Sequence, residues 1–154
     1  MQKDIIRVRA INIRTMKGRS REVVEMLARR RVDICCVQET QYKGEGCTVF
    51  GEGEEGYKFL WMGEDKRGGV GILIREELEK IMEVKRITTR IIKMKLILGG
   101  NLMHVISPYA LQGGKTQEEK EEFWGMMDDS IGNIPKNEVL IGDLNDWRFE
   151  WTCE

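Results

Sequence analysis

The chain has 154 residues, 41% of them hydrophobic and 33% charged, and its 25 basic and 26 acidic residues give a net charge of −1. This length suits a single domain with a buried core, and the proportions are ordinary for a soluble globular protein. The balanced charge excludes a global electrostatic field that attracts nucleic acid, so a polyanion would have to be bound by a local patch or a metal.

The sequence shows no pattern of membrane insertion or export. No apolar run approaches the roughly 20 residues of a membrane span, and Asp4, Arg7 and Arg9 interrupt the apolar stretch that a signal peptide needs. The four cysteines show neither C-x-x-C spacing nor a paired histidine, which argues against a zinc site or a disulfide framework. We therefore expect an intracellular protein, nuclear or cytoplasmic, with reduced thiols and no membrane partner.

The N-terminal third has the pattern of a β-α-β unit. Residues 5–13 alternate in polarity and predict a strand that carries Asn12 near its end. Ser20 is the expected N-cap of the following helix, and Glu22 suits its first turn. Residues 34–37 are apolar without alternation, which indicates a strand buried on both faces, as parallel strands are.

The middle of the chain predicts antiparallel structure. Residues 44–56 contain five glycines and four glutamates and predict a long surface loop. A short helix is expected over residues 76–82. Two hairpins are expected, formed by residues 57–62 with 70–74 and by residues 90–98 with 102–107.

The last third predicts a capped helix and a short buried strand. Thr116 and Glu119 have the spacing of a capping box that opens the helix. Pro135 ends this region, and the apolar strand that follows runs into Gly-Asp-x-Asn over residues 139–145.

Polar side chains stand at the ends of several predicted strands. Asn12, Glu39 and Asp143 each follow an apolar strand, and Asn145 and Tyr109 lie close to strand ends as well. In α/β sheets, ligands bind in the crevice at the carboxyl ends of the strands. The alternative for Asp143 is an ordinary turn, since Gly, Asp and Asn are common in turns. Three strand ends with such residues favour a functional site.

This order of residues resembles the endonuclease/exonuclease/phosphatase superfamily. Within it, residues 19–22, 31–34 and 118–124 resemble the RTE-type retrotransposon endonucleases. The resemblance covers residues 5–145, so we expect a domain over 1–145 and a divergent tail over 146–154. The motifs that carry the superfamily resemblance are residues 11–15, 37–40, 68–72, 107–110 and 141–145.

The resemblance implies a magnesium-dependent site for cleaving DNA, with manganese as an alternative metal. Glu39 would be the direct metal ligand, and Asn12 would hold the metal or the phosphate. Magnesium is a hard ion that takes oxygen ligands and keeps several waters. Asp143 would orient or deprotonate the attacking water, while Asn145 and Tyr109 would donate hydrogen bonds to the phosphoryl oxygens. Nearby Arg14 would contact the DNA backbone, with Lys17, Arg19 and Arg21.

Two departures from the family bear on activity. The first departure is that the given sequence lacks the Ser-Asp-His motif, which the family has far downstream. Its one histidine, His104, cannot replace that motif, because it lies inside a predicted hairpin strand and is expected to be structural. The second departure is the tail, since residues 146–154 no longer match the usual pattern of the family. The fold implied is part of a four-layer α/β sandwich with an incomplete second sheet, which would leave an apolar face for a partner protein or further chain to cover.

Three functions remain in view. The first is a DNA endonuclease-like phosphodiesterase, truncated and weakly active or inactive. The second is a non-catalytic interaction or relic domain, favoured by the absent histidine motif. The third is a phosphatase for small phosphoesters. Metal-dependent nicking of plasmid DNA separates the first from the others.

Overall fold

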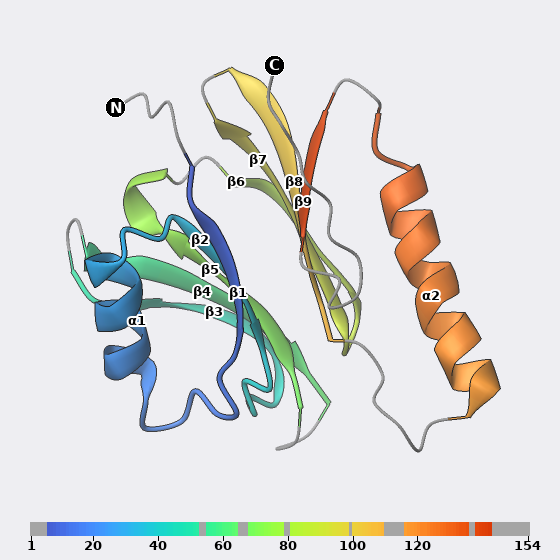
Figure 1. Ribbon diagram of the computed structural model, residues 1–154, viewed down its shortest axis with the longest axis horizontal. Coiled ribbons are helices and arrows are strands. Elements are labelled where there is room, and N and C mark those ends of the chain that lie inside the picture. Colours follow the sequence, from blue (N-terminus) through green and yellow to red (C-terminus); the bar gives the residue numbers. More distant parts are fainter. Residues whose placement is uncertain are drawn as a thin grey trace.

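The computed structural model contains two β-sheets and two α-helices (Figure 1). For residues 82, 98 and 139–142 it describes the backbone only. No helix within the described residues is long and apolar enough to cross a membrane. The structure describes residues 6–52, 55–64, 68–78, 81–98, 100–109, 116–135 and 138–142.

The first sheet has five strands in the order β1-β2-β5-β4-β3. Strands β1 and β2 are parallel and are joined by helix α1 (Ser20–Arg29), whereas β2–β5, β5–β4 and β4–β3 are antiparallel pairs. The predicted β-α-β unit and the first hairpin are therefore confirmed. The strands are β1 (Val8–Asn12), β2 (Ile34–Gln38), β3 (Gly44–Phe50), β4 (Tyr57–Gly63) and β5 (Val70–Arg75).

The second sheet has four described strands in the order β6-β7-β8-β9. The first three form an antiparallel meander, and β9 pairs parallel with β8 after the chain has passed through helix α2 (Gln117–Gly132). The second predicted hairpin is confirmed as β7–β8. The strands are β6 (Ile81–Thr88), β7 (Ile91–Leu98), β8 (Asn101–Pro108) and β9 (Val139–Gly142).

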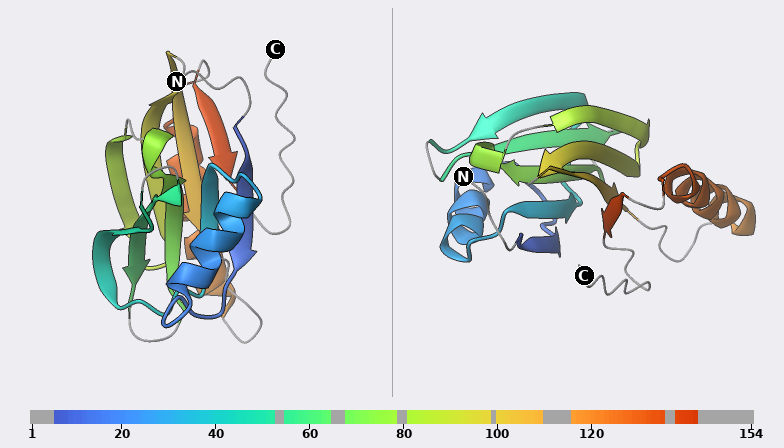
Figure 2. Two further views of the ribbon diagram at one scale, coloured as in Figure 1. Left: turned by 90° about the vertical axis from the view of Figure 1, so that its left-hand side faces the viewer. Right: turned by 90° about the horizontal axis from the view of Figure 1, so that it is seen from above.

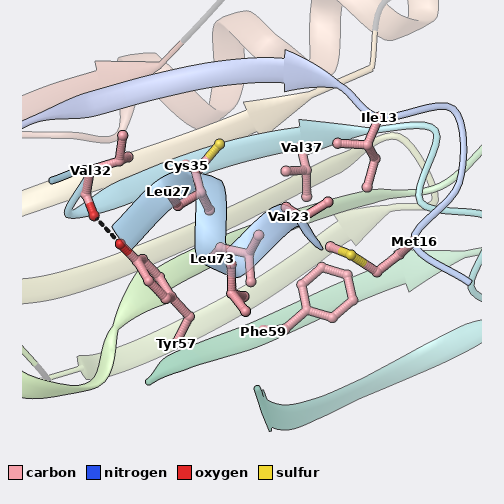
Figure 3. Close-up of a cluster of buried hydrophobic side chains, with 11 residues drawn as sticks. Ile13, Met16, Val23, Leu27, Val32, Cys35, Val37, Tyr57, Phe59 and Leu73 are labelled. Carbon is pink, nitrogen blue, oxygen red and sulfur yellow. Dashed lines mark hydrogen bonds between the residues drawn. The ribbon is translucent and has the colours of Figure 1, made fainter. Parts of the chain in front are cut away.

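The two sheets pack face to face with one helix outside each, which gives four layers (Figures 1 and 2). Between the sheets, the apolar side chains of β2, β5, β7 and β8 form one buried cluster. A second cluster lies between α1 and the first sheet, and includes Leu27, Val37 and Phe59 (Figure 3). A third joins Phe123 and Met127 of α2 to the second sheet. The predicted α/β sandwich is confirmed.

Strand alternation explains how β1 and β2 take part in two clusters. Val8 and Ala10 pack between the sheets, whereas Ile11 and Ile13 face the α1 side, because successive side chains of a strand point to opposite faces. All five residues of β2 are buried, as its unbroken apolar run predicted.

Residues 44–50 form strand β3, so the prediction of a surface loop over 44–56 is wrong there. Strand β3 is an edge strand that pairs with β4 along its whole length. Its outward residues are exposed, and Phe50 on the other face stacks on Phe59 with ring centroids 5.7 Å apart. The strand is held by backbone hydrogen bonds to β4, by this aromatic contact and by a 2.8 Å bond from the Arg86 guanidinium to the Gly46 carbonyl, so its sequence needs no apolar alternation.

Two helix predictions are also corrected. The N-cap of α1 is Arg19 and not Ser20, and no side-chain hydrogen bond caps this helix. Only Glu76–Leu78 forms a short 3-10 turn, and the chain enters strand β6 at Ile81. By contrast, the capping box of Thr116 and Glu119 is present at α2, with both reciprocal hydrogen bonds.

The expected uncovered apolar face is not found within the described residues. Val49 is the only large apolar side chain that is classed as exposed there. The inner faces of the two sheets cover each other, and the helices cover the outer faces. The described strands leave β1 and β9 at the edges of their sheets.

Candidate active site

The strands that carry the predicted site residues end at the same end of the sandwich. In the first sheet Asn12 pairs with Gln38, and in the second Ile106 pairs with Gly142. The two sheets are joined at this end because the Gln38 amide donates a 2.9 Å hydrogen bond to the Pro108 carbonyl. The Ser107 hydroxyl donates a second bond, of 2.8 Å, to the Gly71 carbonyl. Both side chains are buried.

The structure brings Glu39 and Tyr109 together across the two sheets. Glu39 follows β2 and Tyr109 follows β8, and the Tyr109 hydroxyl donates a 2.9 Å hydrogen bond to Glu39 Oε1. Both side chains are half-buried. No described basic side chain forms a salt bridge with Glu39. Among the described residues, this partly buried carboxylate therefore has a phenol as hydrogen-bond donor and no cationic partner.

Glu39 is held in an uncommon backbone conformation. Its φ is +57°, a left-handed value that L-residues adopt rarely and that often marks functional sites. The turn between β4 and β5 fixes this conformation, because the Glu39 amide donates a 2.9 Å bond to the Gly69 carbonyl and the Gln41 amide a 2.7 Å bond to the Gly68 carbonyl. The positive φ expected of these glycines is confirmed at +63° for Gly68 and +93° for Gly69.

Asn12 and Arg14 form an exposed turn beside the Glu39 segment. Asn12 Oδ1 accepts a 3.0 Å hydrogen bond from the Arg14 amide, and Arg14 has a φ of +61°. Beyond the strands, backbone bonds from Ile13 to the Gln38 carbonyl (3.1 Å) and from Met16 to the Thr40 carbonyl (3.0 Å) keep the two segments adjacent. One lone pair of the Asn12 oxygen remains for a ligand.

Arg90 is a part of this region that the sequence analysis did not identify. Its guanidinium carbon lies 5.0 Å from the centroid of the Tyr109 ring. Its Nη1 donates a 3.2 Å bond to the Tyr109 carbonyl, and its own carbonyl accepts a 2.7 Å bond from the Tyr109 amide. The predicted hairpin of residues 90–98 with 102–107 was the available signal, since its register brings residue 90 next to the end of the return strand.

The environment keeps the Tyr109 hydroxyl protonated. Burial raises the pKa of Tyr109 above its ordinary value, and the hydrogen bond to Glu39 and the charge of Glu39 raise it further, against the opposing charge of Arg90. The phenol is therefore a hydrogen-bond donor at neutral pH.

Asp143 and Asn145 lie outside the described residues. Gly142, the last described residue, stands beside Ile106 in the parallel pair of β9 with β8. Among the described residues, no group of three His, Cys, Asp or Glu side chains is close enough to hold a metal ion. Within that part of the chain, Glu39 fits a magnesium ligand because it is a partly buried carboxylate without a cationic partner.

His104 lies outside this region, as the sequence predicted. It is buried on β8, and its Nε2 contacts Glu138 Oε2, the carboxylate of the segment that leads into β9. Four residues of β8 lie between it and Tyr109, and the five residue steps correspond to roughly 16 Å of extended chain. It is a structural histidine.

The sequence profile of the endonuclease/exonuclease/phosphatase family matches residues 10–154 of this chain. The chain belongs to this family. A comparison with curated proteins gave no match.

Solved structures share the fold at low sequence identity. An AP endonuclease from Archaeoglobus fulgidus superposes with a TM-score of 0.66 at 22% identity, over 92% of this chain and 58% of that one. The endonuclease domain of TRAS1, a telomere-specific non-LTR retrotransposon, superposes with a TM-score of 0.57 at 18% identity. The match covers 94% of this chain and 61% of that one. The Xenopus laevis APE2 catalytic domain superposes with a TM-score of 0.64 at 14% identity, and the match covers 90% of this chain and 58% of that one. This chain thus spans about three-fifths of the length of these structures.

Proposed function

We propose that this chain is a magnesium-dependent, DNA-directed phosphodiesterase domain of the retrotransposon-endonuclease type, of which the RTE endonucleases and craniofacial development protein 2-like sequences are the expected relatives. The observation that carries the proposal is the hydrogen bond between Tyr109 and Glu39 at the shared end of the two sheets. Several structural neighbours support DNA as the substrate class, including the TRAS1 endonuclease domain and a 3′ phosphatase from Neisseria bound to a DNA hairpin.

Glu39 and Asn12 would hold the magnesium ion, or manganese in its place. When bound, such an ion neutralises charge on a phosphoryl group and lowers the pKa of a coordinated water. Glu39 suits this role because its carboxylate has no described salt-bridge partner, and because the Gly68–Gly69 turn fixes its backbone.

Tyr109 would donate a hydrogen bond to the phosphoryl oxygen. Its phenol has a single hydrogen, so the bond to Glu39 and a bond to the phosphate are alternatives. A small rotation of the hydroxyl exchanges one acceptor for the other without moving the ring. Asn145 would donate a second bond and Asp143 would orient the attacking water, as the family resemblance implies.

The DNA backbone would be contacted by Arg14 and Lys17. The other two cations near Asn12 are already engaged, because Arg19 bonds the Ile13 carbonyl at 2.8 Å and Arg21 pairs with Glu25 at 3.0 Å. The side chains of Arg14 and Lys17 form no hydrogen bond or ion pair with another described residue, although their backbone amides bond Asn12 and Thr15. Replacing both by alanine should weaken DNA binding and lower its salt dependence, whereas Arg21→Ala should change neither.

Cleavage by this chain should be slow compared with DNA binding. Its one histidine is engaged with Glu138, so no His–Asp pair of the family type is available from His104. A positioned acid–base group contributes roughly 10²–10⁴ in rate, and it acts mainly in the transition state. Binding of magnesium and phosphate depends on other residues and should persist.

The test is plasmid nicking and DNA binding measured in parallel, with magnesium, manganese, calcium and chelator. Glu39→Gln and Asp143→Ala should abolish metal-dependent nicking. Glu77→Gln, an exposed acid in the 3-10 turn, is the matched control and should leave it unchanged. Nicking that is insensitive to both site variants would overturn the proposal.

A non-catalytic DNA-binding or protein-binding domain is the second candidate. The engagement of His104 on the outer face of the second sheet favours it. Metal-independent DNA binding without any nicking, by a folded protein, would support this function over the first.

A further inference from the structure

The Tyr109 ring is held by one arginine and one glycine turn. Strand β8 ends at Pro108, which pairs with Ile91, and Tyr109 follows in the same register opposite Arg90. The Tyr109 amide donates a 2.7 Å bond to the backbone carbonyl of Arg90, and the Tyr109 carbonyl accepts a 3.2 Å bond from the Arg90 guanidinium. The guanidinium that supplies the second bond also lies 5.0 Å from the centroid of the ring. One residue thus fixes both the backbone and the aromatic face of Tyr109.

A second contact limits the ring from another direction. Gly68 lies against it, since a Cβ added at Gly68 would be 3.3 Å from the Tyr109 Cε1 atom. Gly68 also bonds the Gln41 amide, two residues after Glu39. The ring therefore lies beside the turn that orders the Glu39 segment, and its hydroxyl reaches Glu39.

Arg90 itself is held in place by a tight turn. The Thr88 hydroxyl accepts a 3.1 Å bond from the Arg90 amide, in the turn between β6 and β7. Arg90 also lines a cavity of about 260 Å³, together with Thr88, Glu119 and Phe123. Within the described residues, the Arg90 guanidinium donates a hydrogen bond to the Tyr109 carbonyl and to no other backbone carbonyl. This differs from Arg86, whose guanidinium bonds the carbonyls of Trp61 and Gly46.

We propose that Arg90 is a positioning residue that holds the Tyr109 ring so that its hydroxyl is directed at the Glu39 carboxylate. Arginine stacks on an aromatic face and donates hydrogen bonds at the same time. Reacting groups must be placed within a fraction of an ångström, and a misplacement of about 1 Å can cost about 100-fold in rate. The catalytic part of this inference rests on the proposed function, whereas the structural part does not.

The structural part is tested by fluorine NMR with 3-fluorotyrosine in the full chain. The protein has three tyrosines, and each signal is assigned by its Tyr→Phe variant. Arg90→Met keeps the approximate side-chain volume and removes the charge and the donors. It should shift or split the Tyr109 signal and leave those of Tyr42 and Tyr57 unchanged. Arg86→Met is the matched control and should not alter the Tyr109 signal.

The catalytic part is tested by kinetics of metal-dependent nicking. Arg90→Met should lower kcat by between about 10-fold and 100-fold with KM changed less than about threefold. In a Tyr109→Phe background it should cause no further loss, because the hydroxyl that Arg90 directs is already absent. If Arg90→Met does not fold, Arg90→Lys replaces it, with the same tests and a smaller expected loss.

An unchanged Tyr109 signal in the folded variant would overturn the inference. A kcat loss that adds fully to that of Tyr109→Phe would also overturn it, since Arg90 would then act independently of Tyr109. If the parent chain shows no metal-dependent cleavage, the proposed function fails, and the fluorine signal still decides whether Arg90 holds the ring.

Discussion

Gly69 is the residue whose replacement should most clearly connect the fold to the site. Its carbonyl accepts hydrogen bonds from the amides of Glu39 (2.9 Å) and Thr40 (3.4 Å), and its own φ is +93°. A Cβ at this position would lie 2.5 Å from Thr40 Oγ1, and Thr40 is fully buried. The Gly69→Ala variant therefore meets both backbone strain and a collision that the neighbour cannot relieve easily.

The expected loss of stability has two parts. A left-handed conformation costs an L-residue about 1–2 kcal/mol, and overpacking of a buried site costs about 1–3 kcal/mol. Together they give about 2–5 kcal/mol for Gly69→Ala. Gly100 separates the two parts, because its φ of +82° is similar and nothing lies within 4 Å of an added Cβ. Gly100→Ala should cost only the first part, about 1–2 kcal/mol.

Urea unfolding of both variants measures the two costs. Gly69→Ala should be less stable than Gly100→Ala by about 1–3 kcal/mol, the cost of the overpacking alone. It should also bind magnesium more weakly, because relief of the collision moves the Glu39 segment. If the two variants are equally stable, the packing of Gly69 against Thr40 is unimportant, and the reasoning from this contact is refuted.

Three further predictions concern single side chains. Glu39→Gln should weaken magnesium binding at least about 10-fold, which isothermal titration measures, and equal affinity would exclude Glu39 as a ligand. Tyr109→Phe should lower the nicking rate about 100-fold through the loss of one donor, with an unchanged rate as the contrary result. Burial raises the pKa of Tyr57 above its ordinary value of 10.0, so the folded state holds the phenol proton more tightly than the unfolded chain does. This contribution to folding stability is present below pH 10 and is lost as the pH rises above it. Tyr57→Phe should flatten that alkaline decline in thermal unfolding, and an unaltered decline would mean that another group causes it.

Elements with a strong local pattern were predicted from the sequence. The strand predicted from the alternation of residues 5–13 and the Thr116–Glu119 capping box depend on neighbours in the sequence, and the structure has the strand as β1 over Val8–Asn12 and the capping box at α2. Strands β3 and β6 were missed. Strand β3 is an edge strand held by its backbone ladder, and β6 carries charged residues such as Glu83 and Lys85 on its exposed positions. Neither has the apolar alternation by which a strand is recognised.

The site shows the same division between local and long-range information. The sequence predicted Asn12, Glu39 and Tyr109 at strand ends, because each stands directly after or near the end of an apolar run. It could not predict that Arg90 holds Tyr109, since that contact depends on the register of the β7–β8 hairpin. It also could not predict the left-handed φ of Glu39, which is imposed by a glycine turn some 30 residues away.

The candidate site depends on the docking of the two sheets, because each sheet supplies part of it. Glu39 follows a strand of the first sheet and Tyr109 a strand of the second. The side-chain bonds from Gln38 to Pro108 and from Ser107 to Gly71 cross between the sheets at this end. Both pairs are buried, so a shift of one sheet would leave polar groups without partners, which is costly in an apolar interior. The distance between Glu39 and Tyr109 is therefore fixed by the packing of the sandwich as a whole, and a variant that loosens this packing should impair the site before it unfolds the chain.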